Sequence, residues 1–139
     1  MFNIKNILFP IDLDSDDISA VVTALEIAAM FKIPIHIFYV NDIQAGYRHP
    51  TDREDAVALK VREVAPAGLL AEVKIVYAVS KGDLDEEVVK YCRDHSIDLI
   101  VVGHKHRHKI YSSLFDSSDV NIIDAVQLPV LVIPRIDKS

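Results

Sequence analysis

The sequence predicts an α/β protein, a three-layer α/β/α sandwich built on a doubly wound, five-stranded parallel sheet. Two observations favour this fold class. Short apolar runs rich in β-branched residues alternate with longer segments of helical periodicity along the chain. The runs are apolar at nearly every position, which is typical of strands covered on both faces, as in a parallel sheet. Regular alternation of strand and helix then places helices on both faces, joined by right-handed crossovers.

The first half of the chain is predicted to contain two strands and two helices. An apolar run at 7–11 forms the first strand, and the residues at 12–15 supply a turn and a helix cap. Apolar residues at helical spacing predict a helix over 18–31. The second strand is expected at 35–40, and a polar loop leads from it to a short helix near 52–64.

The second half continues the same alternation. A third strand is expected at 73–79, followed by a helix at 84–95 whose first turn is acidic, as the helix dipole favours. The fourth strand covers 99–102. A last helix near 117–126 precedes the fifth strand at 130–133, which lies between two prolines.

Composition fits one domain over residues 1–139, because the chain contains no repeat, linker-like stretch or low-complexity segment. No apolar run approaches the roughly 20 residues of a membrane helix, and residues 1–10 lack the features of a signal peptide. A single cysteine, Cys92, indicates no oxidising compartment. The net charge of −6 argues against a general nucleic-acid binder. We therefore expect a cytoplasmic protein that binds neither membranes nor nucleic acid.

In a doubly wound sheet, ligands bind outside the carboxyl ends of the strands, where the strand order reverses. This rule selects three segments of the chain. They are 10–15 after the first strand, 40–42 after the second and 103–118 after the fourth.

Four motifs, spaced along nearly the whole chain, resemble those of the universal stress protein family. They are Ile-Leu-Phe-Pro-Ile-Asp at 7–12, Gly-Asp-Leu-Asp-Glu-Glu-Val at 82–88, Asp-Leu-Ile-Val-Val-Gly at 98–103 and Leu-Pro-Val-Leu-Val-Ile at 128–133. The resemblance is weakest across 43–70. It implies the fold of the adenine-nucleotide α-hydrolase-like proteins.

The resemblance also allows a comparison of the phosphate loop. ATP-binding members carry Gly-x-x-Gly, nine further residues, then Gly followed by Ser or Thr. On this chain the three glycine positions fall on Gly103, His106 and Asp116, and the hydroxyl position on Ser117. Glycine lets backbone N–H groups approach phosphate oxygens, whereas a histidine side chain occupies that space and a carboxylate repels the phosphates. The loop is therefore predicted to be degenerate, with weak or no ATP binding.

The adenine-side positions that the resemblance implies, Pro10, Asp12 and Val40, remain compatible with a nucleoside, so ATP or AMP is the candidate ligand. The candidate nucleotide cleft comprises the following residues: Pro10, Asp12, Val40, Val102, Gly103, Lys105, His106, Arg107, Asp116, Ser117 and Ser118.

An alternative hypothesis uses the same loop differently. Lys105 and Arg107 can bind phosphate by charge, and Ser117 and Ser118 begin a helix whose free N–H groups favour anions. The chain would then be an ATP- or AMP-binding module or a weak nucleotidase. A third hypothesis is a nucleotide-transferring relative in the broader adenine-nucleotide α-hydrolase group.

Other polar residues are interpreted as structural. Three histidines, at His104, His106 and His108, suggest a zinc site. Their alternate spacing places the three side chains on one side only if the chain is extended, so we prefer a solvated loop and expect no metal. His36 is interpreted as a hydrogen-bonded core or edge residue. Cys92 is interpreted as buried packing, and the acids at 83–87 as partners of the helix dipole.

No catalytic constellation is present in the sequence, and we predict no robust enzyme activity. The first hypothesis is a stress-response or regulatory protein that acts as a homodimer and through an unidentified protein partner. The family resemblance implies a dimer through the last strand, formed by Val130, Leu131, Val132 and Ile133. An apolar strand at a sheet edge also invites pairing unless it is covered.

Overall fold

The computed structural model describes residues 3–11, 13, 19–41, 53–103 and 127–133. The helices and strands within these ranges follow one another as β1 (Ile7–Pro10), α1 (Ala20–Phe31), β2 (Ile35–Asn41), α2 (Glu54–Val64), α3 (Ala67–Glu72), β3 (Ile75–Lys81), α4 (Leu84–Asp94), β4 (Leu99–Gly103) and β5 (Val130–Ile133).

The five strands form one parallel sheet in the order β3-β2-β1-β4-β5, which confirms the predicted fold class. The chain moves outward from β1 to β2 and β3, then crosses back to β4 on the other side of β1. The strand order therefore reverses between β1 and β4. In parallel sheets this is the place where ligands bind.

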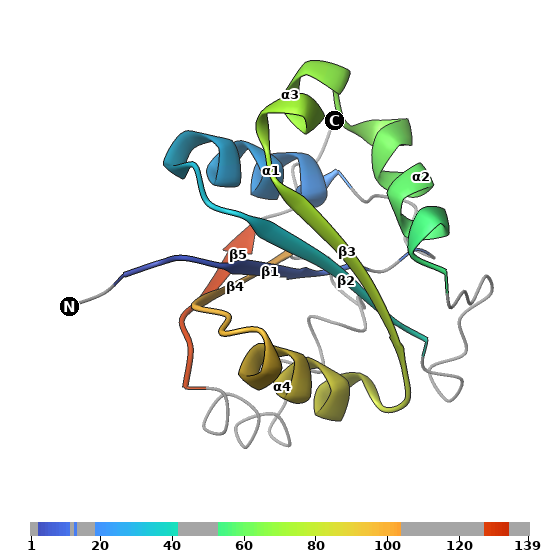
Figure 1. The fold of residues 1–139 in the computed structure, drawn as a ribbon, viewed down its shortest axis with the longest axis vertical. Coiled ribbons are helices and arrows are strands. Elements are labelled where there is room, and N and C mark those ends of the chain that lie inside the picture. The colour runs from blue at the N-terminus through green and yellow to red at the C-terminus, as the bar shows by residue number, and fades with distance from the viewer. Residues whose placement is uncertain (1–2, 12, 14–18, 42–52, 104–126, 134–139) are drawn as a thin grey trace, which may run out of the picture.

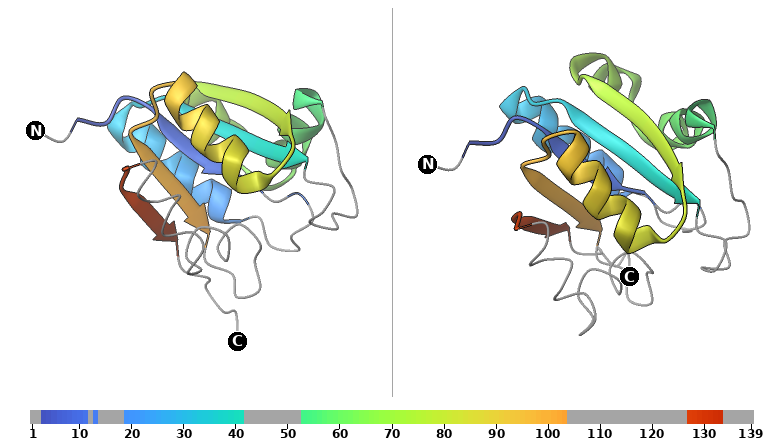
Figure 2. Two further views of the ribbon diagram at one scale, coloured as in Figure 1. Left: turned by 90° about the horizontal axis from the view of Figure 1, so that it is seen from below. Right: turned by 60° about the horizontal axis from the view of Figure 1, so that its bottom comes forward.

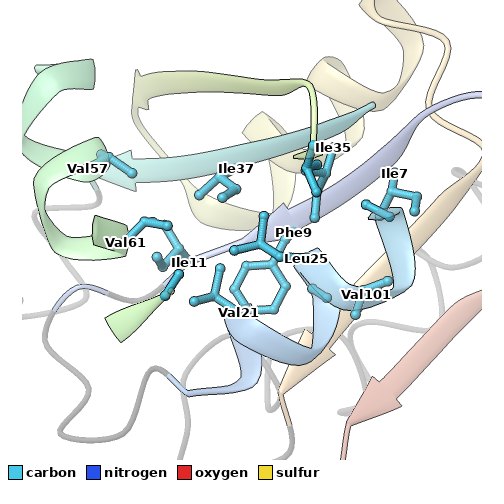
Figure 3. Close-up of a cluster of buried hydrophobic side chains, with 14 of the residues drawn as sticks. Ile7, Phe9, Ile11, Val21, Leu25, Ile35, Ile37, Val57, Val61 and Val101 are labelled. Atoms are coloured by element: carbon cyan, nitrogen blue, oxygen red, sulfur yellow. The ribbon is translucent and has the colours of Figure 1, made fainter. Parts of the chain in front are cut away.

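The helices cover both faces of the sheet, with α1, α2 and α3 on one face and α4 on the other (Figure 1). Figure 2 shows that, among the described helices, α4 is the one that covers the second face of the sheet. Successive strand residues point to opposite faces, so Ile7 and Phe9 of β1 join the cluster under α1, whereas Leu8 joins the cluster under α4. In the first cluster, side chains from β1, β2, α1 and α2 meet (Figure 3).

The structure differs from the sequence prediction between α2 and β3. Helix α2 ends at Val64 because the next residue, Ala65, precedes Pro66 and takes an extended conformation. Helix α3, which the sequence analysis did not predict, then starts after Pro66. Strand β3 begins at Ile75 rather than at 73, because α3 continues to Glu72 and the register pairs Ile35 with Ile75.

The other strands, and the helices predicted at 18–31, 52–64 and 84–95, agree with the structure apart from end residues. The helix predicted near 117–126 lies outside the described residues. Within the described ranges, no helix has the length and apolarity that crossing a membrane requires.

Candidate functional site

The carboxyl ends of β2, β1 and β4 adjoin at the point where the strand order reverses. Pro10 is the last residue of β1, Val40 is the penultimate residue of β2, and Gly103 ends β4. Pro10 pairs with Phe38, and β2 continues beyond this pair to Asn41, flanked there only by β3 within the described residues. The topology thus brings together the parts of the candidate cleft that the structure describes.

Two of these residues contribute their side chains to the core. Val40 and Val102 are buried in the cluster under α4, together with Leu84 and Val88. Their backbone groups remain at the strand ends, while their side chains stabilise the contact between the sheet and α4. Any ligand at this edge would therefore meet the backbone of these two valines rather than their side chains.

Gly103 contacts the start of α1. A Cβ atom built on Gly103 would lie 2.7 Å from the Cβ of Ala20, the first residue of α1. Real carbon atoms do not approach so closely, and a Cβ held by the backbone of each element cannot swing away. Packing of β4 against α1 therefore requires a glycine here, whether or not a ligand binds.

The remaining residues of the predicted cleft lie outside the described residues. These are Asp12, Lys105, His106, Arg107, Asp116, Ser117 and Ser118. His104 and His108 lie there as well. Among the residues that the structure does describe, no three His, Cys, Asp or Glu side chains are grouped so that they could hold a metal ion.

The connection from β3 to α4 borders the same edge of the sheet. Ser80 is the β3 partner of Val40, and its hydroxyl donates a hydrogen bond to the carboxylate of Glu87. Gly82 has φ +142°, a conformation that favours glycine, and its N–H donates to the carbonyl of Asn41 at 3.2 Å. The sequence analysis did not predict the contact between Ser80 and Glu87, because no local pattern pairs a strand end with the following helix.

The acids at 83–87 lie at the start of α4, where they were predicted to be partners of the helix dipole, and the structure shows that Asp83 also caps the helix. The Asp83 carboxylate accepts a hydrogen bond from the backbone N–H of Glu86 at 3.1 Å, and Asp85, Glu86 and Glu87 follow in the first turn. The positive end of the helix dipole favours negative charge at this position. These acids are therefore explained by the stability of α4.

The predictions for Cys92 and His36 are also confirmed. Cys92 is buried under α4, and burial raises the pKa of its thiol to about 12, so the reactive thiolate is scarce near neutral pH. His36 is buried in β2 and hydrogen-bonded through both ring nitrogens.

Comparison with known proteins gives a consistent result. The model of the universal stress protein family matches residues 3–134. Universal stress protein C of Salmonella typhimurium is 30% identical over 56 residues, a match that spans 40% of this chain and 38% of that protein.

Three solved structures share the fold at low sequence identity. Universal stress protein UspA from Lactobacillus plantarum is 22% identical with a TM-score of 0.62, covering 93% of this chain and 97% of that chain. A universal stress protein in complex with cAMP is also 22% identical, with a TM-score of 0.64 and coverages of 94% and 97%. The universal stress protein from Archaeoglobus fulgidus in complex with dAMP is 17% identical, with a TM-score of 0.56 and coverages of 96% and 99%.

Proposed function

The chain belongs to the universal stress protein family, and from this premise we propose that it is a cytoplasmic stress-response regulator that binds ATP weakly or not at all. It acts as a homodimer and through a protein partner, without turning over a nucleotide. The observation that carries this proposal is the loss of two of the three phosphate-loop glycines, which are replaced by His106 and Asp116.

The remaining loop glycine does not argue for a phosphate site. Gly103 has a structural reason to be glycine, because a Cβ there would meet Ala20 at 2.7 Å. The packing of this chain therefore requires Gly103 whether or not ATP binds. Gly103 is thus the one phosphate-loop position that keeps its glycine, and the contact with Ala20 accounts for it.

A second candidate function is binding of an AMP-type ligand. Two solved relatives of the same fold are in complex with cAMP and with dAMP. In this chain the strand ends at Pro10, Val40 and Gly103 adjoin, as a nucleoside site at the point of strand-order reversal would need. The phosphate would then be held by side chains, those of Lys105, Arg107 and Ser117, rather than by a glycine-rich backbone.

The deciding experiment is titration calorimetry of ATP, with and without Mg²⁺, and of AMP and cAMP. The titrations use the wild-type protein and the double variant His106→Gly/Asp116→Gly. We expect no measurable ATP binding to the wild type and restored binding to the double variant. Tight ATP binding by the wild type would contradict the proposal.

The second candidate predicts binding of AMP or cAMP by the wild type. That binding should be lost in Lys105→Ala/Arg107→Ala. The matched control is Lys60→Ala/Arg62→Ala, which removes the same charge from α2, away from the strand ends. If both double variants lose affinity equally, net charge rather than a phosphate contact is responsible.

A further inference from the structure

A polar group lies within the apolar contact between the sheet and α4. His36 of β2 is only 7% exposed and contacts Tyr91 of α4. Its Nδ1 lies 2.7 Å from the hydroxyl of Tyr91, and its Nε2 lies 3.3 Å from Oδ1 of Asn6. The imidazole thus joins three parts of the molecule: β2, the segment before β1, and the last turn of α4.

The hydrogen bonds define the proton positions on the neutral ring. The Asn6 amide nitrogen donates to the carbonyl of Ser96 at 3.4 Å, which leaves Oδ1 of Asn6 to accept from His36. Nε2 of His36 therefore carries the hydrogen, and Nδ1 accepts from the Tyr91 hydroxyl. A proton added to Nδ1 would make it a donor, so the Tyr91 hydroxyl would have to turn its hydrogen away and accept instead. Protonation therefore changes the hydrogen bonding that the neutral imidazole has here.

The rings around His36 form a compact group at the end of α4. Tyr91 stacks on Phe38 of β2 with ring centroids 4.3 Å apart and on His95 with centroids 3.8 Å apart. The His36 ring meets Tyr91 and His95 edge-on, at 5.5 and 5.8 Å. His95 is tied to the same helix end, since its Nδ1 lies 3.2 Å from the Tyr91 carbonyl oxygen.

The charged groups that act on His36 disfavour a proton there. Burial, then the charge of His95 on α4 and that of Lys74 before β3, lower the pKa of His36. Tyr91 stays neutral, since burial raises its pKa to about 12. The segment before β1 contributes the uncharged Asn6. The Asp98 carboxylate, which follows α4, accepts from the backbone N–H groups of Lys5 and Asn6 at 2.7 and 2.9 Å.

We propose that His36, Tyr91 and His95 form an acid-sensitive latch that holds the C-terminal end of α4 on the sheet and releases it when His36 is protonated. The latch rests on packing and hydrogen bonds at the end of the sheet opposite the candidate cleft. It does not depend on the proposed function. The N-terminal end of α4 lies near the candidate cleft, because α4 begins two residues after Gly82, whose N–H donates to the carbonyl of Asn41 at the end of β2.

The direction of the pH effect follows from linkage. The folded state binds the His36 proton less readily than the released state, whose pKa is near the ordinary value of 6.5. Protonation therefore stabilises the released state relative to the latched state as pH falls below 6.5. Above that value the latched state keeps its full stability. Each pH unit below 6.5, down to the folded pKa, raises the opening equilibrium constant up to about tenfold.

Hydrogen exchange of the full chain, followed amide by amide between pH 7.5 and 5.0 and corrected for intrinsic exchange rates, tests the latch. We expect protection to fall at residues of the second half of α4 while the amides of α1 keep theirs. In His36→Gln, which carries an amide and cannot titrate, α4 protection should not change with pH. An equal pH dependence in His36→Gln, or an equal loss of protection in α1 and α4, would overturn the proposal.

A second variant keeps the proposal testable if His36→Gln does not fold. His95→Gln removes the electrostatic effect of His95 that lowers the pKa of His36, so this pKa moves back toward 6.5 and protection of α4 should fall by less on acidification. Imidazole NMR signals provide a direct check in the wild type. A His36 signal that titrates at 6.5 while α4 stays protected would overturn the latch.

Discussion

Three of the four glycines of the chain lie among the described residues, and each stands in a different physical situation. Gly82 has a positive φ and needs glycine for its backbone conformation. Gly103 needs glycine for space, because α1 approaches it closely. Gly68 in α3 has open space where a Cβ would lie and no unusual φ. The same residue type thus has three different energetic consequences on substitution.

Gly103→Ala is expected to destabilise the protein by about 1–3 kcal/mol, the usual range for overpacking. The matched control, Gly68→Ala, should stabilise it by about 0.5–1 kcal/mol, because alanine is the better helix residue. Urea unfolding followed by circular dichroism measures both changes. Equal midpoints for the two variants would contradict the close contact between Gly103 and Ala20.

His36 shows at the same scale how a sequence motif can be interpreted correctly but incompletely. A histidine in an apolar strand predicts a hydrogen-bonded core residue, and the structure confirms this. The identity of its partners, Tyr91 and Asn6, depends on contacts across 55 and 30 positions of the chain. Local sequence contains no information on contacts at that separation.

At the scale of elements, α1 and α4 are stabilised by different means. Helix α1 has no acidic residue in its first turn and is stabilised by burial of four side chains, those of Val21, Ala24, Leu25 and Ala28. Helix α4 has a side-chain cap at Asp83, an acidic first turn and Arg93 in its last turn. The acids of its first turn and Arg93 follow the dipole, whereas Asp94 opposes it. Because α4 has a side-chain cap, it is expected to depend more on its cap than α1 does.

Asp83→Ala is therefore expected to lower the free energy of unfolding by about 0.5–2 kcal/mol, the range for loss of an N-cap. Asp83→Asn should retain most of this stability, since the amide oxygen still accepts the bond from Glu86. Asp94→Ala serves as the control, because it removes an exposed acid from the last turn, where the dipole disfavours negative charge, and should not destabilise the protein. These values come from urea unfolding at pH 7. A loss in Asp83→Asn as large as in Asp83→Ala would mean that charge, not the cap bond, matters.

For the whole molecule, the two edge strands differ in how well they resist pairing. Lys74 precedes strand β3 and Lys81 is its last residue, and charged residues at an edge oppose association with another sheet. Strand β5 contains only apolar residues, and Leu131 is 41% exposed. This contrast supports the proposed homodimer through β5 rather than through β3.

Sedimentation at micromolar concentration is expected to show a dimer for the wild type. Leu131→Lys should weaken association at least about tenfold, because it places two charges in a dimer interface. Leu59→Lys on α2 replaces another exposed leucine and should leave the dimer intact. A monomeric wild type, or equal weakening by both variants, would contradict an interface at β5.

The sequence by itself determined the fold class, all five strands and three of the described helices, because their signals are local: apolar periodicity, an acidic first turn after Gly82, and turn-forming residues between elements. It also indicated the edge of the sheet where Pro10, Val40 and Gly103 meet. Only the tertiary structure decided three further points. They are the helix α3 and the start of β3, the close contact of Gly103 with Ala20, and the partners of His36. A six-residue helix is too short to establish a period. The other two depend on distances between elements that the packing of α1 and α4 on the sheet sets.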